Sequence, residues 1–236
     1  MNSDKPGFDN FAGNYSELLN DPIRERFTGG GSEFFHLRKR DLIRDFCRRR
    51  NLGTRALTLL DLGCGQGELL KLLQSDFAAV AGCDPSAEML EAGGVAAAGI
   101  TTAVQVSPVA IPFEDARFDM ITAVCVFHHV APEHRGSLNA EIRRVLKPGG
   151  VFILIEHNPY NPVTRLIVSR TPVDADAQLL TPGAARGMLR NAGFDTLDRQ
   201  FFLFFPALIY AHCAGLERLM SRLPLGGQYA FFSARA

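Results

Sequence analysis

The chain has 236 residues, which is enough for one large domain or a domain with a small appendage and too few for two full-sized domains. Hydrophobic residues make up 47% and charged residues 21% of the sequence, a balance that excludes a disordered chain. Because 25 acidic residues balance 25 basic ones, the chain as a whole has no electrostatic case for binding nucleic acid.

The cysteines and the apolar stretches indicate the cellular compartment in which the protein is expected. There are five cysteines, an odd number, and no two form a C-x-x-C pair, so the sequence suggests neither a zinc site nor a disulfide framework. The first residues do not resemble a signal peptide. The most apolar stretch, residues 201–216, is interrupted by Pro206 and is shorter than the about 20 residues of a spanning helix. We therefore expect a reduced, soluble, cytoplasmic protein with no metal site.

Residues 1–54 are expected to form an arm and a helix that cover the site. Residues 1–31 are rich in Gly, Asn and Asp, with scattered aromatic residues, which predicts a loose arm. Ser32 predicts an N-cap, and a helix should run from there to about residue 51. Its residues 38–50 include seven basic and two acidic side chains. They indicate either a solvated helix face or a dock for an anionic substrate or a membrane head group.

Residues 55–236 alternate short apolar runs with helical stretches and are expected to form the core. Strands are predicted at residues 57–62, 78–83, 102–106, 118–126 and 151–156, and helices at 68–75, 86–98 and 132–146. Strands that are apolar on both faces and separated by helices indicate a parallel sheet covered on both sides. A helix capped by Thr181, strand-like runs at 194–203 and 229–234, and an apolar, partly helical insertion at about 206–224 complete the chain.

The segment most informative about function is Leu59-Leu-Asp-Leu-Gly-Cys-Gly-Gln-Gly67, which predicts a strand, a glycine turn and the start of a helix. Glycines suit this turn because it is tight and a ligand must approach its backbone closely. The G-x-G-x-G spacing differs from the dinucleotide fingerprint, which would place its last glycine where this chain has Glu68. Asp61 suits an ammonium group and would repel a pyrophosphate. A plain strand-to-helix turn is the structural alternative.

Asp84 is a second candidate, at the end of the following predicted strand. Its two carboxylate oxygens could accept hydrogen bonds from both hydroxyls of a ribose. The alternative is a favourable charge at the N-terminus of the next helix, beside Pro85.

Five segments resemble, in order, the motifs of class I S-adenosylmethionine-dependent methyltransferases: Asp61 to Gly67, Cys83 to Leu90, Ile111 to Asp119, Phe127 to Val130 and Leu146 to Gly150. The resemblance implies an α/β fold with a doubly wound, Rossmann-like sheet of seven mostly parallel strands, an antiparallel last strand and helices on both faces. It implies transfer of a methyl group from S-adenosyl-L-methionine to a small-molecule or lipid-like acceptor, which leaves S-adenosyl-L-homocysteine.

The resemblance also implies cofactor contacts. Asp61 would lie near the amino group of the methionine part, and Asp84 would hold the ribose hydroxyls. Ser107 stands where the family usually has an acidic residue that accepts from the adenine amino group, and its hydroxyl accepts without charge assistance. The remaining contacts implied are Gly63, Cys64, Gly65 and Gly67 at the methionine part, Pro85 at the ribose, Met89 at the adenine, backbone from Cys125, His128 beside the methyl group and Tyr15 as a cover.

The histidines matter because a hydroxyl acceptor would need a base, whereas an amine or a carboxylate would need no strong one. His128 and His157 are the candidates for a catalytic role, by pKa and by position. Each could instead be a histidine that only packs or forms hydrogen bonds.

Two questions stay open at this point. The insertion at about 206–224 could line an acceptor pocket, contact a membrane peripherally or simply cover the core. The competing class of function is a non-catalytic module that binds S-adenosylmethionine or a partner through the same fold. The acceptor, the methylated atom and the oligomeric state do not follow from the sequence.

Overall fold

A sheet of seven strands is the framework of the computed structural model, which describes residues 7–19, 21–29 and 31–235. Its strand order is β3-β2-β1-β4-β5-β7-β6, and β7 runs antiparallel to both of its neighbours while the other strands are parallel to one another. This confirms the predicted fold class, including the antiparallel last strand. The strands are β1 (Thr58–Leu62), β2 (Ala79–Asp84), β3 (Thr101–Val104), β4 (Phe118–Val124), β5 (Leu146–His157), β6 (Phe194–Phe202) and β7 (Gln228–Arg235).

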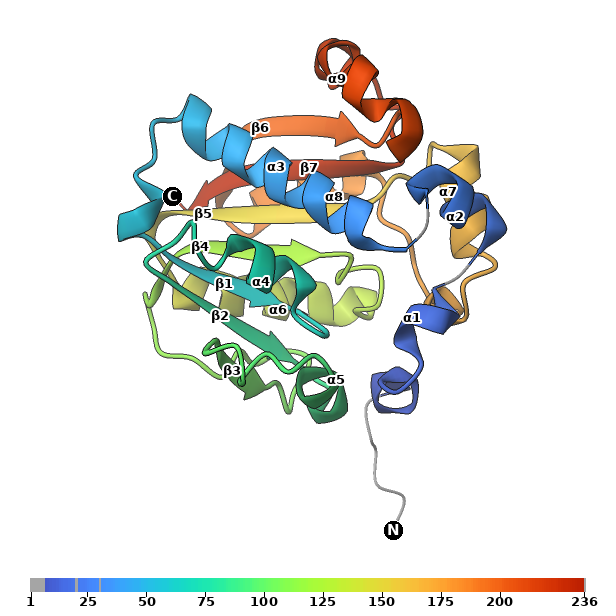
Figure 1. Ribbon diagram of the computed structural model, residues 1–236. Coiled ribbons are helices and arrows are strands. Elements are labelled where there is room, and N and C mark those ends of the chain that lie inside the picture. The colour runs from blue at the N-terminus through green and yellow to red at the C-terminus, as the bar shows by residue number, and fades with distance from the viewer. Residues whose placement is uncertain (1–6, 20, 30, 236) are drawn as a thin grey trace.

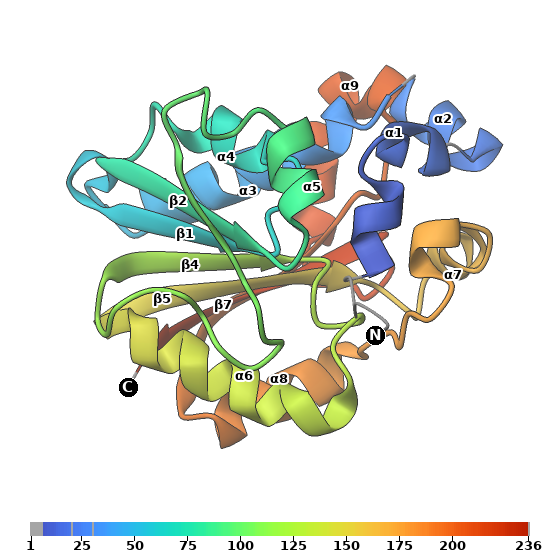
Figure 2. The same ribbon diagram turned by 90° about the horizontal axis from the view of Figure 1, so that it is seen from below.

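Helices cover both faces of the sheet, so each face has its own apolar core. Figure 2 shows α3, α4 and α5 on one face and α6 and α8 on the other. On the first face the ring of Phe46 stacks on that of Phe232, with centroids 4.2 Å apart. The helices are α1 (Tyr15–Leu18), α2 (Pro22–Thr28), α3 (Glu33–Arg49), α4 (Glu68–Leu73), α5 (Ala87–Ala92), α6 (Pro132–Val145), α7 (Pro162–Val168), α8 (Pro182–Asn191) and α9 (Ala207–Met220), with short 3-10 turns η1 (Gly7–Phe11), η2 (Thr54–Ala56) and η3 (Pro172–Asp174).

The N-terminal arm is more regular than predicted. Where it is described it forms η1, α1 and α2, and α1, α2 and α7 lie beyond the carboxyl ends of the parallel strands (Figure 1). Asp21 caps α2 by accepting from the backbone N–H of Ile23 at 2.8 Å, and Pro22 occupies the first helical position. Phe27 of α2 stacks on Phe35 of α3. The expectation of a loose arm is therefore wrong for these residues, because a capped helix with an aromatic contact forms there.

Several predicted boundaries also change. Ser32 precedes α3 but makes no side-chain cap bond. α5 ends at Ala92, well before residue 98, because two glycines follow it and Gly94 has a φ of +60°. β5 begins at Leu146 rather than 151, because Leu146 pairs with Phe118 of β4 before a register shift.

The basic run on α3 is largely neutralised by neighbouring carboxylates. Arg44 pairs with Asp76 at 2.6 Å, and Arg49 pairs with Asp45 and with Asp198 of β6 at 2.8 and 2.9 Å. These pairs favour an ion-paired helix face over an anion dock on the outer surface.

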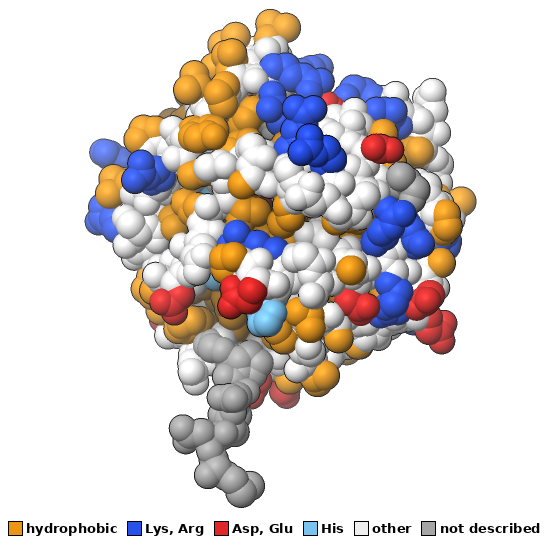
Figure 3. Space-filling model, turned by 180° about the vertical axis from the view of Figure 1, so that it is seen from behind, with side chains coloured by type: hydrophobic (Ala, Val, Ile, Leu, Met, Phe, Trp, Pro, Cys, Tyr) orange, Lys and Arg blue, Asp and Glu red, His pale blue; other side chains and the backbone are white. Residues whose placement is uncertain are grey.

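The predicted insertion forms α9, which stands off one edge of the molecule (Figure 1). Glu217 is the one described residue of this helix that is buried, whereas Leu208 and Leu219 are 87% and 82% exposed. Hydrophobic side chains gather at the top of the molecule, over α9 (Figure 3). Among the described helices, none combines the length and the hydrophobicity needed to cross a membrane.

Candidate functional site

A cavity of about 760 Å³ opens at the carboxyl ends of the parallel strands. Open parallel sheets bind ligands at this edge. The walls come from the ends of β1, β2, β4 and β5, from the arm with α1 and α2, from α3, and from residues 161–174 between β5 and α8. The site therefore combines groups that are far apart in the sequence.

The glycine turn forms one wall of the cavity with its backbone. Gly63 and Gly65 have φ values of +67° and +54°, a conformation that favours glycine. A Cβ on Gly63 would lie 2.6 Å from a methyl group of Val126, so no side chain fits there. Cys64 also lines the cavity, whereas Gly67 does not; a Cβ on Gly67 would lie 2.6 Å from Val95. Gly67 thus serves the turn into α4 and Gly63 allows the close approach of Val126, while Gly63 and Gly65 both line the cavity.

Asp84 ends β2 with its carboxylate directed at the turn. One oxygen accepts from Gly65 N–H at 2.8 Å and the other accepts from Ser86 N–H at 2.9 Å. Burial raises the pKa of Asp84, and these two backbone donors act against that shift. Each carboxylate oxygen can accept about two hydrogen bonds, so capacity remains for a pair of ligand hydroxyls. Pro85 lines the cavity next to it.

Asp61 is a buried carboxylate that would be stabilised by a cation. It accepts from the hydroxyl of Thr122 at 2.6 Å, and burial raises its pKa to about 7. Lys39 of α3 lines the same cavity and is only 7% exposed. Among the described residues Lys39 has no hydrogen-bond or ion-pair partner, so its ammonium is available to a ligand carboxylate.

The side of the cavity next to β3 contains Met89, Gln105 and Val106. Met89 is buried on α5, and its terminal methyl group would lie 3.4 Å from a Cβ on Gly65. Ser107 is not among the residues that line the cavity; its hydroxyl accepts from Val109 N–H at 3.4 Å. Gln105, which is 7% exposed, is therefore the polar side chain that the fold brings to this place.

Cys125 follows β4 in a strained conformation. Its φ is +57°, which is unusual for a residue other than glycine and is often found near functional sites. Its N–H donates to the Ile155 carbonyl at 2.8 Å, and burial raises the pKa of its thiol to about 12. The thiol is neutral at pH 7, so Cys125 contributes shape and backbone rather than a thiolate.

The arm closes over the cavity. Tyr15 at the start of α1 lines it, and Gln66 in the glycine turn donates to the carbonyl of Ala12 at 3.0 Å. Phe8 packs edge-on against the ring of His129, with centroids 5.1 Å apart. Arg24 of α2 also lines the cavity and lies over the ring of Phe35 at 5.0 Å.

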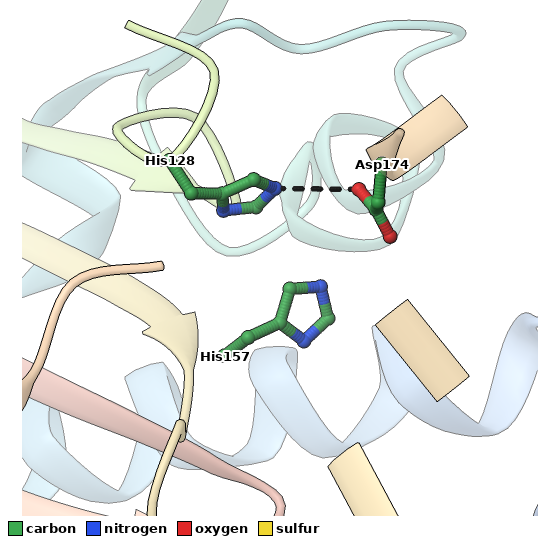
Figure 4. A group of neighbouring side chains, drawn as sticks. All are labelled: His128, His157 and Asp174. Atoms are coloured by element: carbon green, nitrogen blue, oxygen red, sulfur yellow. Dashed lines mark ion pairs between the residues drawn. The ribbon is translucent and has the colours of Figure 1, made fainter. Parts of the chain in front are cut away.

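Two histidines and a carboxylate, His128, His157 and Asp174, lie together in the lining of the cavity (Figure 4). Nδ1 of His128 lies 2.6 Å from Oε2 of Glu156, and the other oxygen of Glu156 accepts from Phe127 N–H at 2.7 Å. Nε2 of His128 lies 3.4 Å from Oδ1 of Asp174, which belongs to η3. His157 ends β5 and lies beside both, with its ring centroid 5.2 Å from that of His128.

The two histidines have opposite pKa shifts. Burial alone would lower the pKa of His128, but Glu156 and Asp174 outweigh it and raise the pKa to about 9. Burial and the positive charge of His128 lower the pKa of His157 to about 3. At neutral pH His128 is therefore protonated and His157 is neutral. A protonated His128 cannot accept a proton from an acceptor.

The structure thus gathers most of the residues predicted for the site along one cavity, with Gly67 and Ser107 outside its lining. Several polar residues that line the cavity were not predicted, among them Arg24, Lys39, Gln105 and Asp174. Lys39 lies in the basic run that the sequence did indicate as a possible anion dock. Gln105 is two residues from the position expected at the adenine. Neither Arg24 nor Asp174 lies in a motif, so no local signal could have found them.

Residues 60–154 match the family model described as Methyltransferase domain. The uncharacterized methyltransferase sll0829 of Synechocystis sp. is 29% identical over 151 residues, which are 61% of this chain and 69% of that protein. The ubiquinone biosynthesis O-methyltransferase of Roseobacter denitrificans is 28% identical, over 64% of this chain and 65% of that protein. The tRNA (carboxymethyluridine(34)-5-O)-methyltransferase of Arabidopsis thaliana is 30% identical, over 59% of this chain and 35% of that protein.

The fold is shared along the whole chain with a solved structure. A complex of the Haloferax volcanii Trm112 methyltransferase activator with a putative methyltransferase contains a chain that matches with a TM-score of 0.68 and 18% identity. The match covers 99% of both chains. At this identity the likeness concerns the fold.

Proposed function

We propose that this chain is a class I S-adenosylmethionine-dependent methyltransferase that methylates a small-molecule or lipid-like acceptor bound in the cavity described above. The observation that carries the proposal is the pairing of the glycine turn with Asp84. Gly63 and Gly65 of the turn line the cavity, and a buried carboxylate with spare acceptor capacity lies beside them. This arrangement suits a ribose and its attached amino-acid tail.

The cavity residues fit S-adenosylmethionine, which supplies an electrophilic methyl group when bound. Asp61 would hold the amino group of the methionine part and Lys39 its carboxylate, since both are buried and Lys39 has no described partner. Asp84 would accept from the ribose hydroxyls. The other residues proposed for the cofactor are Tyr15, Gly63, Cys64, Gly65, Pro85, Met89, Gln105 and the backbone of Cys125.

The task left to the protein is to align the acceptor and exclude water, and positioning alone can supply several kcal/mol. The arm supports this role because Tyr15 and Phe8 cover the cavity and the contact of Gln66 with Ala12 ties the arm to the glycine turn. His128 would lie beside the methyl group, and His157 near it, where the acceptor atom must come.

The rest of the cavity supports a largely apolar acceptor. Apolar residues of α2, α3, α7, η3 and the β6–α9 connection line it. The whole cavity, of about 760 Å³, would hold the cofactor together with this acceptor. Arg24, which lines the same region, is available for a polar end of the molecule. The cavity residues that form this apolar part are Phe27, Phe35, Ile167, Val168, Val173, Leu203 and Phe204.

Nucleic acid is disfavoured as the acceptor, although one relative is named for tRNA. The chain has no net charge, and the basic residues on the outer face of α3 are paired with carboxylates. A nucleic-acid binder needs unpaired basic side chains that contact phosphates. A cytoplasmic location stays a prediction.

The exposed apolar face of α9 supports peripheral contact with a lipid surface, which would suit a lipid-like acceptor. Leu208 and Leu219 are largely exposed, and the exposed Arg218 is next to Leu219 in the sequence. Apolar side chains flanked by basic ones are typical of helices that lie in the membrane interface.

Methyl transfer from radiolabelled S-adenosylmethionine to a panel of acceptors tests the proposal. The panel should contain phenols, amines, carboxylates and isoprenoid-tailed compounds, each with and without vesicles. Labelled product with an apolar acceptor supports the proposal. Binding of S-adenosylhomocysteine without transfer to any acceptor, tRNA included, would favour a non-catalytic binding module.

A further inference from the structure

We propose that His128, His157 and Asp174 form a binding site for one divalent transition-metal ion in the wall of the cavity. The three side chains come from the loop after β4, from the end of β5 and from η3, and they converge in Figure 4. The existence of the site is independent of the proposed function; only the idea that the ion holds the acceptor rests on it.

The donor atoms are already close enough for a common ion. One nitrogen of each histidine and one oxygen of Asp174 all lie within 4.8 Å of one another. Metal–ligand distances of about 2.0–2.2 Å place neighbouring donors about 3–3.5 Å apart. Shifts of about 1 Å or less in side-chain position therefore assemble the site without any change in the sheet.

His128 has the orientation that is usual for a metal-binding histidine, with one ring nitrogen held by a carboxylate. Its Nδ1 is paired with Glu156 at 2.6 Å, and Glu156 is itself fixed by Phe127 N–H. Its Nε2 is buried, has no hydrogen-bond partner among the described residues and is directed at Asp174. A carboxylate on one ring nitrogen with the other left for the ion is the usual arrangement around such ligands.

The charges in this wall also suit a dication. Glu156 and Asp174 place two carboxylates around two imidazoles in a buried region. Without an ion, a proton on His128 neutralises one of them. Lys39 and Arg24 line the same cavity and could also neutralise these carboxylates, but neither is within ion-pair distance of Asp174 or Glu156. His128 and His129 are within that distance. His129, with Nε2 at 3.5 Å from Asp174, could add a further ligand.

The donor set points to the class of metal. Two imidazole nitrogens and one carboxylate oxygen suit Zn²⁺, Mn²⁺, Fe²⁺ or Co²⁺, whereas Mg²⁺ and Ca²⁺ prefer all-oxygen sites. Three protein ligands leave positions open toward the cavity. An acceptor with neighbouring oxygen atoms could occupy them, and the histidines would then hold the ion instead of accepting a proton.

The test is binding of Co²⁺ and Zn²⁺ to the full chain after treatment with a chelator, without S-adenosylmethionine. Calorimetry should give one ion per chain, and Co²⁺ should produce the visible absorption of a site with nitrogen and oxygen ligands. Asp174→Asn and His157→Gln should each weaken binding at least tenfold, and Glu156→Gln should weaken it about 10- to 100-fold. His212→Gln, a matched change on exposed α9, should leave metal binding unchanged.

Binding of S-adenosylhomocysteine to the same samples separates this proposal from the proposed function. A chain that binds the nucleoside but no Co²⁺ or Zn²⁺ overturns the metal site alone. Metal binding that survives both Asp174→Asn and His157→Gln, or a thiolate-to-cobalt charge-transfer band, places the ion elsewhere and also overturns it. Far-ultraviolet circular dichroism of each variant shows that lost binding does not come from unfolding.

Discussion

At the scale of single residues, Asp84 carries the largest share of the predicted cofactor recognition. Asp84→Asn keeps the size of the side chain and one acceptor oxygen but removes the charge. We expect the affinity for S-adenosylhomocysteine to fall by about 1–3 kcal/mol, the range for hydrogen bonds to charged groups. Calorimetry measures it, with the exposed Asp195→Asn as a matched control. An Asp84→Asn variant that is folded and binds as tightly as the original chain would contradict this role.

Gln105 and Ser107 are alternative candidates for the polar contact with the adenine. The structure indicates Gln105, whereas the sequence motif indicates Ser107. Gln105 is buried in the cavity wall and Ser107 lies outside the lining. We expect Gln105→Ala to weaken binding of S-adenosylhomocysteine by about 0.5–1.5 kcal/mol and Ser107→Ala to have no measurable effect. A larger loss of affinity for Ser107→Ala than for Gln105→Ala would contradict this expectation and would mean that the segment after β3 changes position when the ligand binds.

His128 should make stability depend on pH in a defined window. Glu156 and Asp174 raise the pKa of His128 in the folded protein to about 9, above an ordinary value of about 6.5. Its full contribution to the free energy of unfolding is therefore present below pH 6.5. The contribution is lost as the pH rises toward 9. The neighbours that face His128 are Glu156, Asp174, His129 and His157.

Urea unfolding with a chelator present, between pH 6 and 9.5, measures this loss. The original chain should lose up to about 3 kcal/mol more than His128→Gln over that range. His212→Gln on α9 is the control. Equal slopes for the original chain and His128→Gln would show that the imidazole is not held protonated by the two carboxylates.

Some residues of the site could be predicted from the sequence and others could not. Asp61 and Asp84 were predicted as cofactor contacts from the glycine turn, the strand end and the motif resemblance. The parallel pairing of β1 and β2 brings both strand ends to one edge of the sheet. Asp174 reaches the same cavity from an irregular segment, 17 residues after His157. Its position depends on the path of that segment in three dimensions, which no periodicity encodes.

At the scale of elements, α9 is held by its one buried charge rather than by its leucines. Glu217 pairs with Arg38 of α3 at 2.5 Å and also accepts from Phe204 N–H at 2.9 Å. Arg38 in turn lies 3.8 Å from the centre of the Tyr210 ring. This polar anchor leaves the apolar face of the helix turned outward.

We expect that face to contact lipid vesicles. Leu208→Glu combined with Leu219→Glu should reduce cosedimentation with anionic vesicles severalfold, because two apolar side chains are replaced by charges that anionic lipids repel. Binding of S-adenosylhomocysteine should be unchanged, since neither leucine lines the cavity. Glu133→Gln on exposed α6 is a control for altered surface charge. Equal sedimentation of the original chain and the double variant would exclude α9 as the membrane contact.

The elements that sequence predicted best are those with strong apolar patterns, such as β1, β2 and β4. The elements that it missed include α1, α2, α7 and η3, which are short. Of these, α2 and α7 begin at a side-chain cap. Asn161 caps α7 by accepting from the N–H groups of Val163 and Thr164. Asn161 precedes Pro162 and has the extended backbone that a residue before proline favours, and it is the N-cap of α7.

At the scale of the whole molecule, the balanced charge hides a strong local asymmetry. The basic residues of α3 are paired on its outer face, while Lys39 on its inner face enters the cavity. One helix thus stabilises the surface through ion pairs and places a cation where a ligand carboxylate can bind it. A sequence-based count of charges could not separate these two roles, because they differ only in the direction of the side chains.

We propose above all that the turn after β1 and Asp84 of β2 together bind S-adenosylmethionine or its product. A crystal structure with S-adenosylhomocysteine tests it most directly. We expect the ribose hydroxyls within about 2.5–3.2 Å of the Asp84 oxygens and the amino group of the tail beside Asp61. A nucleoside bound away from Asp84, or a cavity that stays free of it at saturating concentration, would contradict the claim.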